Sequence, residues 1–145
     1  MAITSTLTTS FKKELLQGVH NFNKASSPDT FKLALYSSSA SLDASTTAFT
    51  TSGEVSGTNY TSGGATLTLK TGTPTTDGTT ALVDFDNLTF SNVTVTAAGA
   101  LIYNSTDSNK AVCVIDFGKD ITATASDLTI TFPSTGASNS IIRLA

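Results

Sequence analysis

Hydroxyl-bearing side chains set the strongest constraint on what this chain can fold into. Of its 145 residues, 28 are Thr and 19 are Ser, whereas charged residues make up 13%, about half of the usual share of roughly 25%. The β-branched Thr side chain fits a pleated, half-buried strand better than a helix interior. The composition therefore predicts a mainly β protein, and the length predicts a single domain over residues 1–145.

One segment near the start has a helical period. Its apolar side chains recur every three or four positions on one stripe: Phe11, Leu15, Leu16, Val19 and Phe22. We expect an amphipathic helix over residues 9–22, capped by Thr9 or Ser10, within an N-terminal arm and helix that span residues 1–28. Gly18 inside this helix indicates either close packing or an early end.

From residue 31 the apolar period changes to two, which is typical of strands. The alternation and the turn-forming residues between segments predict strands at 31–36, 65–69, 81–90, 93–103, 111–117, 128–132 and 141–144. The pattern predicts that residues 31–145 form an antiparallel sandwich or jelly-roll-like barrel of about seven or eight strands. Segments 97–103 and 111–115 are apolar on both faces. We expect them to be central, covered by a second sheet on one face and by the helix or a partner chain on the other.

The composition argues against several classes of function. One His and one Cys cannot build a zinc cluster or an internal disulfide, and we expect neither a metal nor another cofactor. A net charge of -3 and the absence of Trp make nucleic acid an unfavourable partner. The sequence contains neither a membrane-length apolar run nor a signal-peptide pattern, so we expect a soluble chain that is made in the cytoplasm.

Few residues offer catalytic chemistry. Asp84 and Asp86 alternate with apolar residues, so we expect both carboxylates on the solvated face of a strand, although such a pair could also serve acid–base chemistry or bind calcium. His20 has no nucleophile or carboxylate beside it that would suggest a triad, and it is expected to cap the helix or lie at the surface. Cys113 lies in an apolar strand and is expected in the core. We therefore expect no catalytic residues.

Charge is distributed unevenly along the chain. Residues 1–32 contain four Lys and two acidic residues, a net +2, whereas the remainder contains four basic and nine acidic residues, a net -5. The hydroxyl-rich surface has few long charged side chains, so its burial against another protein costs little side-chain entropy and little ion desolvation. Such a surface favours assembly.

The order of these elements resembles that of small virion proteins of tailed bacteriophages. The segments that carry the resemblance are the helix at 11–22, FKLALY at 31–36, NYTSGG at 59–64, ALIYN at 100–104, IDFGKDI at 115–121 and LTITFP at 128–133. Proteins of this class commonly decorate, or cement, the outer shell of the capsid, and others lie at the head-to-tail junction or in the tail. The resemblance implies a structural virion role without catalysis.

Together these observations predict a capsid decoration protein that binds the major capsid protein at the capsid surface. Lys12, Lys13 and Lys24 are expected to steer it toward acidic shell surface, and Phe11 and Phe22 to anchor it unless they belong to its own core. The alternative for the helix is that its apolar stripe covers the sheet. Shell symmetry favours a homotrimer over a dimer.

Two other classes of function stay open at this point. A tail or fibre module that binds carbohydrate would expose its aromatic residues Tyr36, Tyr60 and Tyr103 on loops. A glycosidase would need two carboxyl groups facing a cleft, and Asp84 would be one of them. The small number of charged residues makes the enzyme the weakest of the three alternatives.

Overall fold

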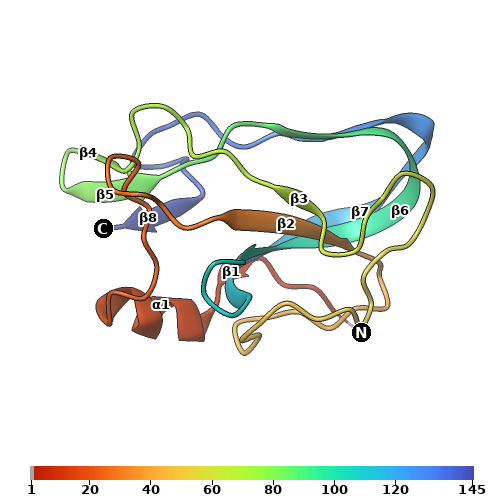
Figure 1. Ribbon diagram of the computed structural model, residues 1–145, viewed down its shortest axis with the longest axis horizontal. Coiled ribbons are helices and arrows are strands. Elements are labelled where there is room, and N and C mark those ends of the chain that lie inside the picture. Colours follow the sequence, from red (N-terminus) through yellow and green to blue (C-terminus); the bar gives the residue numbers. More distant parts are fainter. Residues whose placement is uncertain (1) are drawn as a thin grey trace.

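The computed structural model describes residues 2–145 and contains two antiparallel sheets and one short N-terminal helix (Figure 1). The elements are β1 (Thr6–Leu7), α1 (Thr9–Leu16), β2 (Phe31–Tyr36), β3 (Ala65–Thr66), β4 (Thr75–Asp77), β5 (Thr80–Val83), β6 (Leu88–Asn104), β7 (Lys110–Ile130) and β8 (Ile142–Leu144). The five-stranded sheet has the order β1-β7-β6-β2-β3, and the three-stranded sheet has the order β4-β5-β8. The predicted mainly β, antiparallel class with one N-terminal helix is confirmed, and the arrangement is consistent with a β-sandwich.

One long hairpin, formed by β6 and β7, extends through both layers of the sandwich. β6 has 17 residues and β7 has 21, and the ribbon that they form turns back over β2 at one end of the molecule (Figure 1). The register is irregular at the turn, because Gly99 pairs with Asp116 while Ala97 pairs with Ile121. Four residues of β7 therefore stand opposite Ala98 alone, and such a bulge bends a strand sharply.

This hairpin corrects the predicted strand boundaries. The strand expected at 93–103 is the larger part of β6, and those expected at 111–117 and 128–132 largely fall within the single strand β7. The strand expected at 81–90 is interrupted between Val83 and Leu88, and the turn expected before it contains β4. Short local patterns do not reveal that a strand continues through a bend, because the continuity depends on its partner.

The main core lies between the layers, and a second apolar cluster lies on the other face of the five-stranded sheet. This second cluster includes Tyr36, Leu101 and Tyr103, and it is covered by Leu42 and Phe49 from the loop that connects β2 to β3. Figure 1 shows that loop on the side of β2 opposite the upper ribbon. The helix or partner chain expected on this face is thus replaced by the chain's own hydroxyl-rich loop.

The helix is shorter than predicted and starts from a different cap. Thr8, rather than Thr9 or Ser10, is the N-cap, and its hydroxyl accepts a 3.2 Å hydrogen bond from Phe11 N. α1 ends at Leu16, and Gly18 follows with φ of +73°. Glycine adopts this left-handed conformation at little steric cost, so the early end that Gly18 suggested is confirmed.

Candidate partner-binding site

The exposed side of α1 carries the first features of the site. Lys12 and Lys13 are exposed, and Leu16 at the end of the helix is 91% exposed. Among residues 2–145, neither lysine forms an ion pair, because the ion pairs there are His20–Glu14 and Lys110–Asp107. The helix therefore presents two unpaired cations and one bare leucine to solvent.

Phe11 and Phe22 are not available as anchors, which corrects the expectation that they contact a partner. Both side chains are buried in the main core. The Phe22 ring stacks on Phe31 at a centroid distance of 4.4 Å, and the Phe11 ring lies 4.9 Å from His20. Phe11 and Phe22 therefore belong to the protein's own core, as the alternative interpretation of the helix expected.

Lys24 is exposed but is tied to the body of the protein. Its Nζ donates a 2.9 Å hydrogen bond to the carbonyl oxygen of Leu69. Since Leu69 lies between β3 and β4, this contact ties the loop after α1 to the segment that connects the two sheets. Lys24 thus retains its charge at the surface with less freedom than Lys12 or Lys13.

The strand β8 separates two hollows, because successive side chains of a strand point to opposite sides. Ile142 and Leu144 face one hollow, whereas Ile141 and Arg143 face the other. We call the first the leucine pocket. It measures about 180 Å³, and its lining is apolar: Leu15, Phe22, Pro74, Ala81, Leu82, Val83, Ile142 and Leu144. Leu144 is itself 50% exposed.

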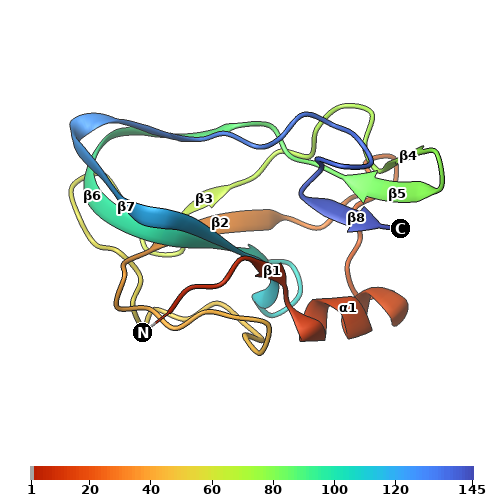
Figure 2. The same ribbon diagram turned by 180° about the vertical axis from the view of Figure 1, so that it is seen from behind.

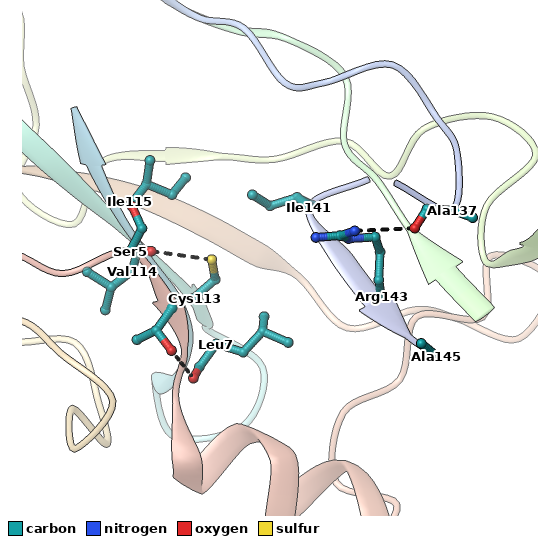
Figure 3. Close-up of a pocket in the computed structure, with 10 residues that line it drawn as sticks. Ser5, Leu7, Cys113, Val114, Ile115, Ala137, Ile141, Arg143 and Ala145 are labelled. Carbon is teal, nitrogen blue, oxygen red and sulfur yellow. Dashed lines mark hydrogen bonds between the residues drawn. The ribbon is translucent and has the colours of Figure 1, made fainter. Parts of the chain in front are cut away.

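The hollow on the other side of β8 is larger, and we call it the edge slot (Figure 3). It measures about 540 Å³. One wall consists of residues 5–7 and 113–115, from β1 and the start of β7, and the other of Ala137, Ile141, Arg143 and Ala145. Figure 3 shows Leu7 and Ile115 on one side of the slot and Ile141 and Arg143 on the other.

A third hollow extends the edge slot along β7. This apolar groove measures about 330 Å³ and shares Ile115 and Ile141 with the slot. Phe117 and Ile121 of β7 line it and are only partly buried. In Figure 2, β1, β7, β8 and α1 are seen together from this direction. The edge slot and the apolar groove on one side of β8, the leucine pocket on its other side, and exposed α1 together surround this strand, and we call this whole surface the β8 face.

Asp84 and Asp86, whose carboxylates were considered for acid–base chemistry, do not form an acid–base pair. Asp86 is exposed as predicted, but Asp84 is fully buried, which corrects its expected place on the solvated face. β5 ends at Val83, and the chain then changes partner, because Phe85 forms an isolated antiparallel bridge with Leu69; the alternation expected for one continuous strand does not hold there. The two carboxylates therefore do not share an accessible surface.

Asp84 has an unusual environment for a carboxyl group. Its Oδ1 accepts a 3.0 Å hydrogen bond from Phe85 N, and its Oδ2 has no hydrogen-bond partner among the described residues. Burial raises the pKa of Asp84 above its ordinary value, and the Phe85 amide and the charge of Lys70 partly oppose that rise. This group is placed to affect stability rather than to meet a substrate.

His20 is buried, which corrects its expected place as a cap or a surface residue. Its Nε2 lies 2.8 Å from Glu14 Oε2 and its Nδ1 lies 3.0 Å from Asn104 Nδ2. Asn104 also donates to Asp29 Oδ2 at 2.7 Å. This buried network joins α1, the loop after it and the end of β6, and the imidazole side chain has no solvent access.

Cys113 lies in the core, as predicted. Its thiol is buried against Val114, whose carbonyl oxygen lies 3.6 Å from Sγ, and burial raises the pKa of Cys113 to about 12. The described residues contain no group of three or more His, Cys, Asp or Glu side chains that could hold a metal ion. No helix within residues 2–145 is long and apolar enough to cross a membrane.

The three tyrosines hold loops against the sheet instead of projecting from them. Tyr36 and Tyr103 are buried, and their hydroxyls donate 2.6 Å hydrogen bonds to Thr50 O and Gly63 O. Tyr60 is half-buried, and its hydroxyl accepts from Leu35 N and donates to Glu54. The carbohydrate alternative required these rings to be exposed, so it loses the residues on which it depended.

Comparison with protein-family models, with curated proteins and with solved structures found no match to this chain. The geometry of the β8 face is therefore the basis for assigning a function to this chain.

The walls of this face are not evident from the sequence. Residues 141–144 were predicted as a closing strand, and its bounds are nearly those of β8. A signal was present, because Ile141 and Ile142 place apolar side chains on both faces of a strand that ends the sequence. Whether those faces are covered depends on the strands beside them, which the local pattern does not show.

Proposed function

We propose that this protein is a non-enzymatic structural component of a tailed-bacteriophage virion that decorates and stabilises the outer shell of the capsid. The β8 face binds the major capsid protein. The observation that carries this proposal is the exposure of Leu144 in the apolar leucine pocket and of Leu16 on α1, the helix that also carries unpaired Lys12 and Lys13.

The apolar part of the face supplies affinity. Burying an exposed Leu side chain contributes about 1.5–3 kcal/mol, and Leu16 is 91% exposed while Leu144 is 50% exposed. Interface residues that fill pockets near the centre of a contact dominate binding energy. A bulky side chain of the shell protein that enters the leucine pocket would bury Leu144, and contact with the exposed side of α1 would bury Leu16.

The basic part of the face supplies orientation and rate. Unpaired cations at the rim of an interface accelerate encounter with an acidic surface and fix its register, and salt screens this effect. Lys12 and Lys13 have this role in the proposal, and Lys24 contributes charge from the adjoining loop. A homotrimer, with a dimer as second choice, would repeat the contact and strengthen attachment through avidity.

The location of the protein is the first test. Gold-labelled antibody against the protein should mark the heads of intact phage particles, whereas labelling confined to tails would refute decoration of the shell. Shells from the same phage that lack the protein should then bind the purified chain in a sedimentation assay.

Variants identify the binding face. Leu16→Ser should weaken shell binding about tenfold, which corresponds to about 1.4 kcal/mol. Lys12→Glu should slow association at low salt, whereas Lys119→Glu changes the charge equally on the bulge of β7 and is the matched control. Shell binding that is equal for all three variants and the wild type would refute the assignment of this face.

A further inference from the structure

The edge slot lies between two strand edges that have no partner on the slot side. β8 is the last strand of the order β4-β5-β8, and β1 is the last strand of the five-stranded sheet. Residues of both strands line the slot. In an edge strand the N–H and C=O groups of every second residue point away from its one partner, so β8 and β1 have backbone donors and acceptors free to pair with a further strand.

The edge of β7 beyond β1 is also unpaired, but it is less suited to the addition of a strand than the edges at the slot. Beyond Val114, β7 pairs only with β6, and its other edge carries a four-residue bulge at 117–120 and the exposed charges of Asp116 and Asp127. Bulges and charges of this kind discourage the addition of another strand. The walls of the edge slot contain no acidic side chain.

The lining of the slot indicates which segment it would accept. Leu7, Ile115 and Ile141 make its walls apolar, and Arg143 is the one charged side chain among its lining residues. Among residues 2–145, Arg143 forms no ion pair, and its Nη1 donates to Ala137 O at 3.3 Å. Lys12 and Lys13 lie on α1, which follows β1 after one residue. An acidic segment with alternating apolar side chains complements these charges and walls.

We propose that the edge slot binds an extended, acidic segment of the shell protein as an added β-strand hydrogen-bonded to β8. This inference rests on the proposed function and names the form of the partner within it. Main-chain hydrogen bonds would supply affinity and the alternate side chains specificity. About four residues, spanning about 13 Å, suffice to pair with the three residues of β8.

A capped heptapeptide of alternating valine and threonine, with aspartate at both ends, is the probe. It should slow hydrogen exchange of the β8 amides at least tenfold and shift the backbone resonances of Leu7 and Arg143. The same peptide N-methylated at alternate amides keeps its side chains but loses its donors, so it should give no protection. Equal binding of the methylated peptide, or no binding of the unmethylated one, would overturn the inference.

Charge provides a second comparison. A lysine-ended version of the probe should bind at least tenfold more weakly to the wild type, and Arg143→Glu should reduce or reverse that preference. Lys119→Glu is the matched control and should leave the preference unchanged. A preference that survives Arg143→Glu would contradict the role of Arg143 in the slot.

Shell binding separates this inference from the function on which it rests. If shells bind and saturating aspartate-ended peptide displaces the protein, both stand. If shells bind equally well with the peptide present, strand addition is refuted and decoration of the shell stands. If the wild-type protein does not bind the shells, the proposed function is refuted, even where the peptide occupies the slot.

Discussion

The imidazole of His20 is held in one tautomer by Asn104. The Oδ1 of Asn104 accepts hydrogen bonds from Thr106 N and Asp107 N, so its amide NH2 group faces His20 Nδ1 at 3.0 Å. Nδ1 must therefore accept, and Nε2 carries the proton that is donated to Glu14. The end of α1 is thereby connected to the hairpin turn between β6 and β7.

Removing this imidazole should destabilise the protein. We expect His20→Ala to lower the free energy of unfolding by about 2–4 kcal/mol, because it leaves a cavity and an unsatisfied buried amide. Urea denaturation followed by circular dichroism measures the change. Lys13→Ala, on the exposed face of the same segment, should change stability by less than about 0.5 kcal/mol. A similar small change for both variants would show that the network contributes little.

Replacing the N-cap should distinguish Thr8 from Thr9. The Thr8 hydroxyl accepts from Phe11 N and donates to Ala111 O at 3.3 Å, and the residue is buried. We expect Thr8→Ala to cost about 1–2 kcal/mol, and Thr8→Ser to retain most of the stability. Thr9→Ala, at an exposed position, should be nearly neutral in the same denaturation experiment. A larger loss for Thr9→Ala would restore Thr9 as the cap.

Neutralising Asp84 should stabilise the protein in a pH-dependent manner. Because burial raises the pKa of Asp84 in the folded state, the native chain binds more protons than the unfolded chain between the ordinary pKa near 3.9 and the raised one. Stability due to this group therefore falls as pH rises through that interval. Asp84→Asn should exceed the wild type by about 1 kcal/mol at pH 7, because the amide carries no charge to desolvate.

Unfolding measured from pH 4 to pH 7 tests the sign of this effect. The advantage of Asp84→Asn should shrink toward pH 4, where the wild-type carboxyl becomes protonated. The exposed Asp86→Asn removes the same charge two residues away and should change stability by less than about 0.5 kcal/mol. An advantage that grows as the pH falls would contradict the effect assigned to burial.

The thiol of Cys113 should be inert in the folded protein. It is buried, and burial raises its pKa to about 12, so the reactive thiolate is scarce at pH 8. Labelling with a chromogenic disulfide reagent should be at least a hundredfold slower in buffer than in denaturing urea. Rapid labelling without urea would show that the wall of the edge slot opens readily.

Local sequence patterns predicted several elements well. The strand at 31–36 has the predicted bounds, because large apolar residues alternate through it and turn-forming residues surround it. The exposed positions of Lys12 and Lys13 agree with the polar side of the helical stripe. Each of these features depends on residues that are close together in the sequence, where spacing alone determines which side chains share a face.

Other features depend on contacts distant in the sequence. Residues 118–127 contain Gly118, Lys119 and Asp120 and resemble a loop, yet they belong to β7 because β6 lies beside them. Phe22 lies beyond the helix and still reaches the core, since the chain turns back after Gly18. Asp84 turns inward because its strand ends one residue earlier.

The amino-acid sequence by itself determined the mainly β class, the position of the one helix, and a surface rich in hydroxyl groups and poor in charge. Tertiary structure alone decided which apolar side chains the molecule uses for its own core and which it leaves open, as at Leu16 and Leu144. The physical reason is that burial depends on which strands become neighbours, and residues far apart in the chain determine that pairing.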